Sequence, residues 1–407
     1  MKSYSFFLIA ACLLCPATIL AQLGNRYASM VFENVTTTTE IPFSSAVGVD
    51  QILPTTLYLD FYEPAGDTLS ARPLVITVFG GAFVVGSRDW CDMVEYCTRF
   101  AKHGYAAASI DYRLLPILSV SASSLIRNAY MASQDVNSAI RYFKAHCQEY
   151  RIDTNNIFLL GNSAGSIATL NEIFMSAGER PSETFEFPDL GPINSSGYDE
   201  YYGFSSKVAG AVTHWGGVLD VDVVDLEEYV PLCMIHGTVD NVVPYDSGFC
   251  YSSLPLSIFP YMYGSYAIAD RLSDLGITDY EFHPFEGEAH NFYISESGDL
   301  DMDKFNTCFN IARNFLYNHL DFHSTTGVHQ YATDNIRIYP NPASDMLFVE
   351  VKGGEGIANV VLCDMQGRIV EESNGSSISL GHLPSGVYVV NVTDSNGSKF
   401  IQKVIVK

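Results

Sequence analysis

The sequence predicts an α/β fold with a mostly parallel central sheet, followed by a small all-β domain. Three observations predict it. Strand-length apolar runs alternate with helical repeats as far as residue 320, a Gly-x-Ser-x-Gly pattern stands between a strand and a helix, and short alternating runs begin at Ile336. A hydrophobic content of 47% and an aromatic content of 13% suffice for a large buried core.

The predicted strands are short apolar runs, which are typical of strands buried on both faces of a parallel sheet. These runs are residues 73–79, 105–110, 156–160, 208–212, 232–235 and 280–284. Helical spacing predicts helices over residues 89–102, 127–150, 166–174, 267–275 and 303–320. Strands and helices that alternate in this way form a sheet with helices on both faces.

Two segments do not fit the alternation of strands and helices. Residues 178–205 are polar and rich in Gly, Pro, Ser and Tyr, so we interpret them as an insertion. Residues 249–266 are aromatic without a clear period. Each segment is either a wall above a pocket or a packed loop, and the sequence leaves both interpretations open.

The chain is predicted to have four parts. Residues 1–21 resemble a signal peptide, with Lys2 at the charged end and an apolar run before small residues. A catalytic domain (22–322), a polar linker (323–335) and the all-β domain (336–407) follow. The alternative at the N-terminus is a lipoprotein modified at Cys12. No later apolar run is long enough to span a membrane, so we expect no membrane span in the mature protein.

The formal net charge of −24 lies almost entirely between residues 22 and 335, because residues 336–407 carry nearly equal numbers of acidic and basic side chains. Such a surface repels phosphate backbones and anionic lipids. We therefore expect neither nucleic acid nor a membrane surface as a partner.

Seven cysteines remain after removal of the predicted signal peptide, and an odd number cannot all pair within one chain. Cys91 and Cys97 lie on one predicted helix about 9 Å apart along its axis, too far for a disulfide. No CxxC or Cys/His spacing suggests zinc, so we predict no metal site. The sequence does not determine the pairing of the cysteines.

The candidate nucleophile is Ser163, in Gly161-Asn162-Ser163-Ala164-Gly165. An apolar strand precedes this segment and a helix-compatible run follows it, which is the setting of a nucleophile elbow. The turn must be tight and strained so that the serine oxygen projects above the sheet, and small flanking residues permit it.

A serine nucleophile requires a base and an orienting carboxylate, which follow it in the order acid, then histidine, in this type of site. Asp240 comes directly after the predicted strand at 232–235, and Asp246 is the alternative acid. His290 lies in a loop before the last predicted helix. His236 and His214 compete with it, but both lie at strand ends before the acid, and His236 is better explained by hydrogen bonds to the backbone.

An oxyanion hole requires convergent backbone N–H groups. Ala164 follows the nucleophile and supplies one of them. The Gly-rich turn Phe79–Phe83 follows an early predicted strand, and we expect Gly81 and Ala82 to supply the others. The alternative is that the Gly-Gly pair only ends the strand and has no role in catalysis.

With these residues in place, the region from about residue 56 to 320 resembles the carboxylesterase/hormone-sensitive-lipase-like branch of the α/β-hydrolases. Besides the elbow, the matching motifs are FGGAF (79–83), SIDYRL (109–114), Ile152-Asp153, HGTVD (236–240) and GEAHNF (287–292). The resemblance implies an α/β-hydrolase fold and ester hydrolysis. Phe79 is a departure, since the family usually has a histidine there that braces the oxyanion loop.

The last 70 or so residues resemble the C-terminal sorting domain of the type IX secretion system of Bacteroidetes. The matching motifs are IYPNPA (338–343), DMQGR (364–368), LPSGVY (383–388) and the ending KVIVK (403–407). The resemblance implies passage through the periplasm and across the outer membrane, to a secreted or surface-attached location. A carbohydrate-binding β-sandwich is the alternative.

The sequence therefore predicts a secreted serine hydrolase that cleaves carboxylic esters through an acyl-enzyme on Ser163, without a metal or organic cofactor. The alternatives are a serine peptidase with the same three residues and a catalytically inactive surface binding module. A small-molecule ester or an acetylated or feruloylated polysaccharide fits a secreted bacterial enzyme. The sequence does not determine the substrate, the acyl-chain preference or the oligomeric state.

Overall fold

The computed structural model describes residues 26–321 and 336–407, with the exception of 50, 52, 228, 254–258, 296, 352–356, 364–368 and 395–398. The chain divides into two compact units, residues 1–320 and 321–407, and each is described by itself. The predicted signal peptide (1–21), the linker (323–335) and the DMQGR motif lie outside the described residues.

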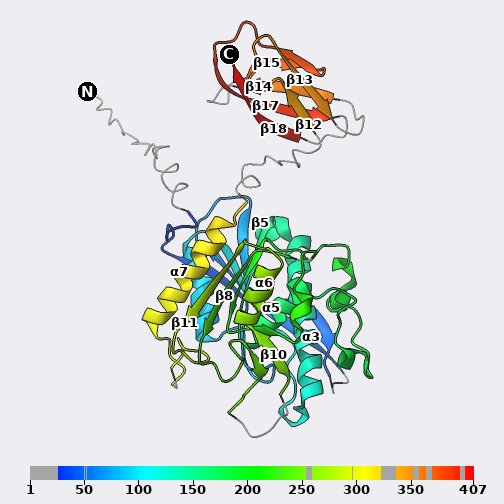
Figure 1. Cartoon of the computed structure of the whole chain (residues 1–407), viewed down its shortest axis with the longest axis vertical. Coiled ribbons are helices and arrows are strands. Elements are labelled where there is room, and N and C mark those ends of the chain that lie inside the picture. The colour runs from blue at the N-terminus through cyan, green and yellow to red at the C-terminus, as the bar shows by residue number, and fades with distance from the viewer. Residues whose placement is uncertain are drawn as a thin grey trace, which may run out of the picture. The chain divides into compact units, whose positions relative to one another are not determined.

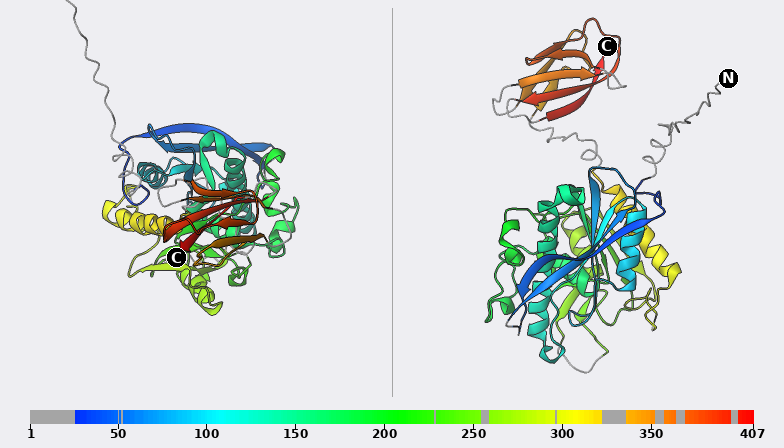
Figure 2. Two further views of the ribbon diagram at one scale, coloured as in Figure 1. Left: turned by 90° about the horizontal axis from the view of Figure 1, so that it is seen from above. Right: turned by 180° about the vertical axis from the view of Figure 1, so that it is seen from behind.

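The first unit is built on an eight-stranded sheet in the order β1-β2-β4-β3-β5-β6-β8-β11 (Figures 1 and 2). Its strands are β1 (Val35–Val47), β2 (Pro54–Pro64), β3 (Arg72–Val78), β4 (Ala106–Ile110), β5 (Ile152–Asn162), β6 (Gly210–His214), β8 (Leu232–Gly237) and β11 (Tyr280–Phe285). From β4 to β11 all neighbours are parallel. The prediction of a mostly parallel sheet is confirmed.

Helices cover both faces of this sheet (Figure 2). They are α2 (Cys91–Lys102), α3 (Ala122–Ala145), α4 (Cys147–Tyr150), α5 (Ala164–Phe174), α6 (Ser265–Asp274) and α7 (Met302–Asn318). Phe100 of α2 packs against Phe309 of α7, with 5.1 Å between ring centroids. Since the strands β3, β4, β5, β6 and β8 are almost fully buried, their side chains form the core of the unit.

The predicted helix over residues 127–150 was wrong at its start and in its continuity. Helix α3 begins at Ala122, because the Ser121 side chain accepts a hydrogen bond from the Ser124 N–H and forms a capping box with it. Helix α3 ends at Ala145 with His146 as its C-cap. The short α4 ends at Tyr150, and its C-cap Arg151 has a left-handed φ of 54°. A local polar cap therefore decides where α3 begins, which the apolar period does not mark.

Two long antiparallel strands, β1 and β2, were not predicted. β1 is largely exposed and rich in threonine, so it lacks the apolar run that marks the central strands. β2 alternates in burial over its first half and pairs with β4 on its other side. β1 therefore forms one edge of the sheet, and β2 joins it to β4.

Two antiparallel sheets form the second unit, as predicted for a small β-sandwich: β12-β13-β16 and β15-β14-β17-β18. Its strands are β12 (Ile336–Tyr339), β13 (Met346–Val351), β14 (Ile357–Cys363), β15 (Ile369–Ser373), β16 (Ser377–Ser379), β17 (Gly386–Asp394) and β18 (Lys399–Val406). Leu347, Leu362 and Val390 belong to one buried cluster between the sheets. The Asn341 side chain accepts a hydrogen bond from the Ile405 N–H at 3.0 Å, so the PNPA motif is bound to the last strand.

No helix in the described parts of the chain has the length and apolar character needed to cross a bilayer. The six cysteines whose side chains the structure describes are all free thiols, so Cys91 and Cys97 do not bridge each other.

Candidate active site

Ser163 stands at a sharp turn between β5 and α5. Its backbone has φ 50° and ψ −119°, a conformation that L-residues rarely adopt. A Cβ on Gly161 would lie 2.5 Å from the Gly165 carbonyl oxygen, and one on Gly165 would lie 2.1 Å from the Val78 carbonyl oxygen. Only glycine fits at either position, so the two glycines of the motif are required by the turn itself.

The structure brings Ser163, His290 and Asp240 into one hydrogen-bonded chain. The Ser163 Oγ lies 2.8 Å from His290 Nε2, and His290 Nδ1 lies 2.6 Å from Asp240 Oδ2. Asp240 follows β8 and His290 follows β11, two neighbouring parallel strands. The ends of these strands place the acid and the histidine next to each other, although 50 residues separate them.

Asp240 is fully buried and accepts several hydrogen bonds. Its Oδ1 accepts from the N–H groups of Val242 and Val243, at 2.8 and 3.1 Å. Burial alone would raise the pKa of the Asp240 carboxyl, but hydrogen bonds from His236 and His290 outweigh it and bring the pKa to about 2. The carboxylate is therefore ionised at neutral pH, where it can hold His290 in one tautomer.

The competing histidines occupy other places. His236 lies 3.2 Å from the Val243 carbonyl oxygen, as expected, and also contacts Asp240 Oδ2 at 3.2 Å. His214 is buried beneath the elbow with its Nε2 3.0 Å from the Tyr96 hydroxyl, and burial lowers its pKa to about 4. The contact of His236 with the acid was not predicted.

The turn from Gly80 to Phe83 lies directly against the elbow. A Cβ on Gly80 would lie 3.1 Å from the Ser163 Cβ. Gly81, Ala82 and Phe83 all have positive φ, at 107°, 54° and 62°. Ala82 and Ala164 line the same pocket as Ser163. Because Ala164 is the first residue of α5, its N–H has no acceptor within the helix.

Phe79 contributes a different brace from the histidine that the family usually has. Its ring stacks on Tyr112 with 4.3 Å between centroids. The Tyr112 hydroxyl in turn donates to the Gly80 carbonyl at 2.9 Å. Tyr112 stands in the SIDYRL motif, but nothing in the sequence showed that it reaches the loop.

Two further contacts near the elbow were missed. Trp215, fully buried, packs against the His290 ring with 5.8 Å between centroids. The buried Asp92 carboxylate accepts a hydrogen bond from the Asn162 side chain, next to the nucleophile. Burial raises the pKa of Asp92 to about 6. No spacing in the sequence connects these residues, since the sheet brings them together.

An apolar pocket of about 50 Å³ opens beside Ser163. It is lined by Ala82, Phe83, Leu125, Ile126, Ala129, Ser163, Ala164, Ile167, Leu219, Val242, Val243, Cys250, Tyr251, Phe259, Pro260 and Met262. Within the described part of the segment 249–266, five residues line the pocket, which supports the interpretation of these residues as a pocket wall. The segment 178–205 instead packs on α3, where Arg127 donates to its backbone carbonyls, and it borders a second cavity through residues 179–183.

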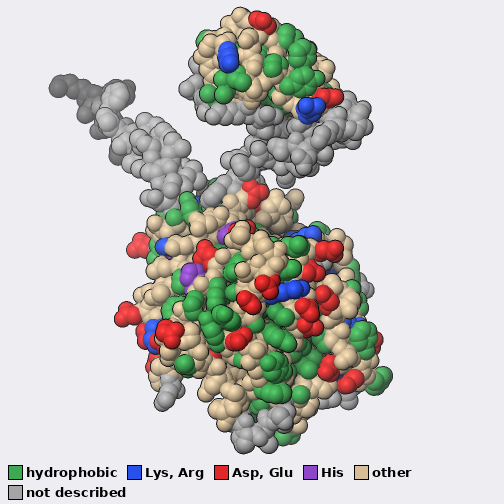
Figure 3. Space-filling model, in the orientation of Figure 1, with side chains coloured by type: hydrophobic (Ala, Val, Ile, Leu, Met, Phe, Trp, Pro, Cys, Tyr) green, Lys and Arg blue, Asp and Glu red, His purple; other side chains and the backbone are tan. Residues whose placement is uncertain are grey.

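On the face drawn in Figure 3, hydrophobic side chains gather over α6 and β10 (Tyr261–Gly264), with more acidic than basic side chains around them. β10 carries Met262 into the pocket. On this face the side chains over α6 and β10 are thus largely apolar and acidic side chains outnumber basic ones, in keeping with the net charge of −24.

Comparison with known proteins gives matches to both units. Residues 59–184 match the BD-FAE family, and residues 337–407 match Por_Secre_tail, a secretion system C-terminal sorting domain. The first match includes Ser163 and the oxyanion turn and ends before Asp240.

Among curated relatives, the probable isoprenylcysteine alpha-carbonyl methylesterase ICMEL1 of Arabidopsis thaliana is 28% identical over 151 residues, 36% of this chain and 28% of that protein. Lipase 2 of Geotrichum candidum is 25% identical over 128 residues, 30% of this chain and 23% of that protein. The chain thus spans less than a third of the length of these relatives.

Among solved structures, a propionate-bound esterase of Thermogutta terrifontis is 22% identical with a TM-score of 0.48, covering 72% of this chain and 97% of that one. The first unit has the mostly parallel sheet and serine elbow of an α/β-hydrolase fold, and residues 59–184 within it match the BD-FAE family. The second unit matches a secretion system C-terminal sorting domain.

Proposed function

We propose that this chain is a secreted serine hydrolase that cleaves carboxylic esters through an acyl-enzyme on Ser163. The hydrogen-bonded chain from Ser163 through His290 to Asp240, with distances of 2.8 and 2.6 Å, carries this proposal. A serine hydroxyl becomes a nucleophile when a neighbouring imidazole can take its proton and a carboxylate orients the imidazole.

In the proposed acylation, the Ser163 Oγ attacks the acyl carbon of the ester while His290 Nε2 takes the serine proton. Asp240 stabilises the imidazolium that forms. The N–H groups of Gly81, Ala82 and Ala164 donate to the oxyanion, and each such donor contributes roughly 3–4 kcal/mol in comparable sites. The tetrahedral intermediate collapses, and the leaving alcohol takes its proton from His290.

Deacylation repeats these steps with water in place of the serine. His290 takes a proton from water, the hydroxide attacks the acyl carbon, and Ser163 leaves with the proton from His290. No metal ion or organic cofactor enters either half of this reaction.

The relatives support the class of reaction, because the Arabidopsis protein is named as a methylesterase and the Geotrichum protein as a lipase. The pocket beside Ser163 bears on the acyl group. Its volume of about 50 Å³ is well below the roughly 300–1,000 Å³ of pockets that hold drug-sized ligands. We therefore propose short acyl chains, and acetyl rather than feruloyl groups on a small molecule or a polysaccharide.

The sorting domain indicates that the chain is secreted or held at the cell surface. We propose that residues 1–21 direct it to the periplasm and that residues 336–407 direct it through the type IX machinery of a Bacteroidetes bacterium. The chemistry would then act on esters outside the cell.

A fluorophosphonate probe tests the nucleophile in the purified full chain. Covalent labelling of the wild type and none of Ser163→Ala is expected. Labelling of both, or of neither, would contradict the assignment, and no labelling of the wild type would favour an inactive binding module.

Rates over p-nitrophenyl esters of increasing chain length, with acetylated xylan and peptide anilides alongside, test the substrate class. We expect kcat/KM to be highest for acetate to butyrate and to fall steeply beyond. Turnover of peptide anilides at rates similar to the esters would instead identify a peptidase.

A further inference from the structure

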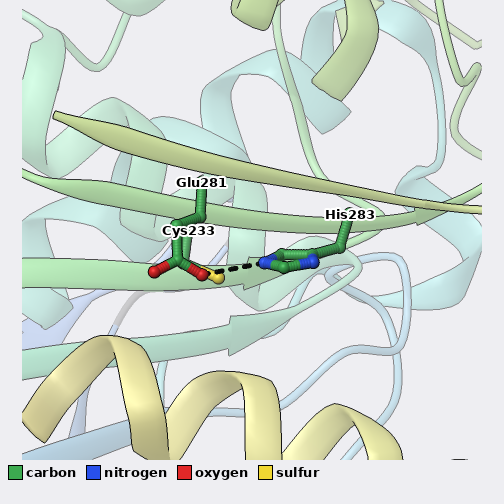
Figure 4. Close-up of side chains that lie close together, drawn as sticks. All are labelled: Cys233, Glu281 and His283. Atoms are coloured by element: carbon green, nitrogen blue, oxygen red, sulfur yellow. Dashed lines mark hydrogen bonds and ion pairs between the residues drawn. The ribbon is translucent and has the colours of Figure 1, made fainter. Parts of the chain in front are cut away.

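Three metal-ligating side chains lie together on the two strands that lead to Asp240 and His290. They are Cys233 on β8 and Glu281 and His283 on β11 (Figure 4). The sulfur, one carboxylate oxygen and one imidazole nitrogen all lie within 4.8 Å of one another. None of the three has a part in the proposed ester hydrolysis.

The strand register explains why these side chains meet. β8 and β11 are parallel, and Glu281 lies opposite Cys233. His283 is two residues further along β11, so its side chain points to the same face of the sheet as that of Glu281. Phe282, between them, points to the other face, where its ring stacks on Tyr245. The backbone of two paired strands therefore holds the cluster in place.

The cluster is buried on one side and open on the other. Cys233 is fully buried, while the side chains of His283 and Glu281 are 33% and 36% exposed. Burial raises the pKa of the Cys233 thiol, and the neighbouring Glu281 and the Cys308 thiol on α7 raise it further. β11 is the last strand of the sheet, so an ion has access from the sheet edge.

The donor set indicates the kind of ion. Thiolate, imidazole and carboxylate are the protein ligands of Zn²⁺, at about 2.3, 2.0–2.1 and 2.0–2.2 Å. Ligands at these distances around a tetrahedral ion lie roughly 3.3–3.7 Å from one another. In the cluster the three ligand atoms lie within 4.8 Å of one another, and His283 Nε2 lies 2.9 Å from Glu281 Oε2, a contact that the ion would replace. Ca²⁺ and Mg²⁺ prefer oxygen ligands alone, so a thiol and an imidazole disfavour them.

We propose that Cys233, Glu281 and His283 bind one Zn²⁺ ion, with water as the fourth ligand, and that this ion links the edge strand β11 to β8. β11 has a single neighbour in the sheet, and the loop that follows it carries His290. A zinc ion that links the two strands would hold the end of β11 in place, and with it the loop that positions His290. The proposal is independent of ester hydrolysis and stands or fails separately from it.

Metal titration of the chelator-stripped full chain tests the site. Zinc is added in competition with a chromophoric chelator, and cobalt is added in a separate experiment as a spectroscopic substitute. We expect one ion per chain and a thiolate-to-cobalt charge-transfer band. Free zinc at one hundred times Kd is expected to raise Tm by roughly 5 °C.

Cys233→Ser is expected to lose the charge-transfer band, and His283→Asn to weaken zinc binding more than about 100-fold. His319→Asn is the matched control, because it removes another partly exposed histidine that contacts a carboxylate, Asp279. If Cys233→Ser does not fold, His283→Asn decides the question. Zinc binding by His283→Asn equal to the wild type, no charge-transfer band, or a Tm unchanged by saturating zinc would each overturn the proposal.

Discussion

The two halves of the candidate active site are held in place by different means. The nucleophile half consists of the elbow with Asp240 and His290, and the oxyanion half is the turn from Phe79 to Phe83. In the elbow, main-chain atoms approach Gly161 and Gly165 too closely for any Cβ. In the oxyanion half, a Cβ on Gly81 would also meet main chain, 1.9 Å from the Val85 carbonyl oxygen. Side chains add a second support there, with Phe79 stacked on Tyr112 and the Tyr112 hydroxyl bonded to the Gly80 carbonyl.

The kind of support at each position explains which residue types that position can accept. A collision between backbone atoms leaves glycine as the one residue that fits, whereas a brace made by side chains can be built from more than one residue type. Phe79 illustrates the second case, since stacking on Tyr112 stands where the family usually uses a histidine. Gly161, Gly165 and Gly81 should therefore tolerate no change, whereas position 79 should accept more than one residue type.

The largest effect is expected for Asp240→Asn in the nucleophile half. The amide favours the wrong tautomer of His290, so kcat for p-nitrophenyl acetate should fall on the order of 10⁴-fold with little change in fold. Steady-state kinetics measures kcat, and circular dichroism shows whether the fold is retained. Asp246→Asn, the alternative acid, should keep wild-type activity, and a comparable loss in that variant would show that the acid is misassigned.

Gly165→Ala should disrupt the elbow itself. The added Cβ would lie 2.1 Å from the Val78 carbonyl oxygen, so the strand and the helix must move apart. We expect a loss of more than about 4 kcal/mol in the free energy of unfolding, or no soluble protein. Gly203→Ala is the control, because a Cβ added to Gly203 would have no atom within 4 Å. Near wild-type stability of Gly165→Ala in urea unfolding would refute the steric argument.

Phe79→Ala tests the oxyanion half. Removal of this buried ring should cost about 3–5 kcal/mol of stability and lower kcat more than it changes KM, because the oxyanion donors lose their support. Phe187→Ala, which alters a side chain that is 99% exposed, should change neither quantity. If Phe79→Ala is destabilised but keeps full kcat, the ring supports the core and not the oxyanion turn.

The pKa of Asp240 predicts a dependence of stability on acid. Its pKa is lowered from 3.8 to about 2 in the folded chain. The stabilisation is therefore complete above about pH 4 and is lost as the pH falls towards 2, a change of about 2 kcal/mol. Chemical unfolding at a series of pH values measures it. Asp240→Asn should flatten this part of the curve, and an unchanged slope would show that other carboxyl groups are responsible.

The smallest effect is expected for Tyr112→Phe, which keeps the stack on Phe79 but removes the hydrogen bond to Gly80. We expect a loss of about 1 kcal/mol in stability and up to about a tenfold loss in kcat. Tyr130→Phe is the matched control, since its hydroxyl also donates to a glycine carbonyl, that of Gly191, at 3.0 Å. Equal kcat losses in the two variants would mean that the oxyanion turn does not depend on Tyr112.

Several features could be predicted from the sequence by itself. The parallel strands and the serine elbow follow from apolar runs and from glycines required by a tight turn, both of which are local properties. The sandwich of the second unit follows from alternating runs separated by turn residues. Ser163, Asp240 and His290 could be proposed as site residues because each stands in a recognisable local motif.

Other features depended on the tertiary structure, because they join residues that are far apart in the chain. The contacts of Trp215 with His290 and of Asp92 with Asn162, and the cluster of Cys233 with His283, arise where neighbouring strands and the helices that cover them meet. No period or spacing along the chain encodes such contacts, since the pairing of strands creates them. The same reason applies to the pocket, whose lining comes from α3, α5, β10 and the segments between them.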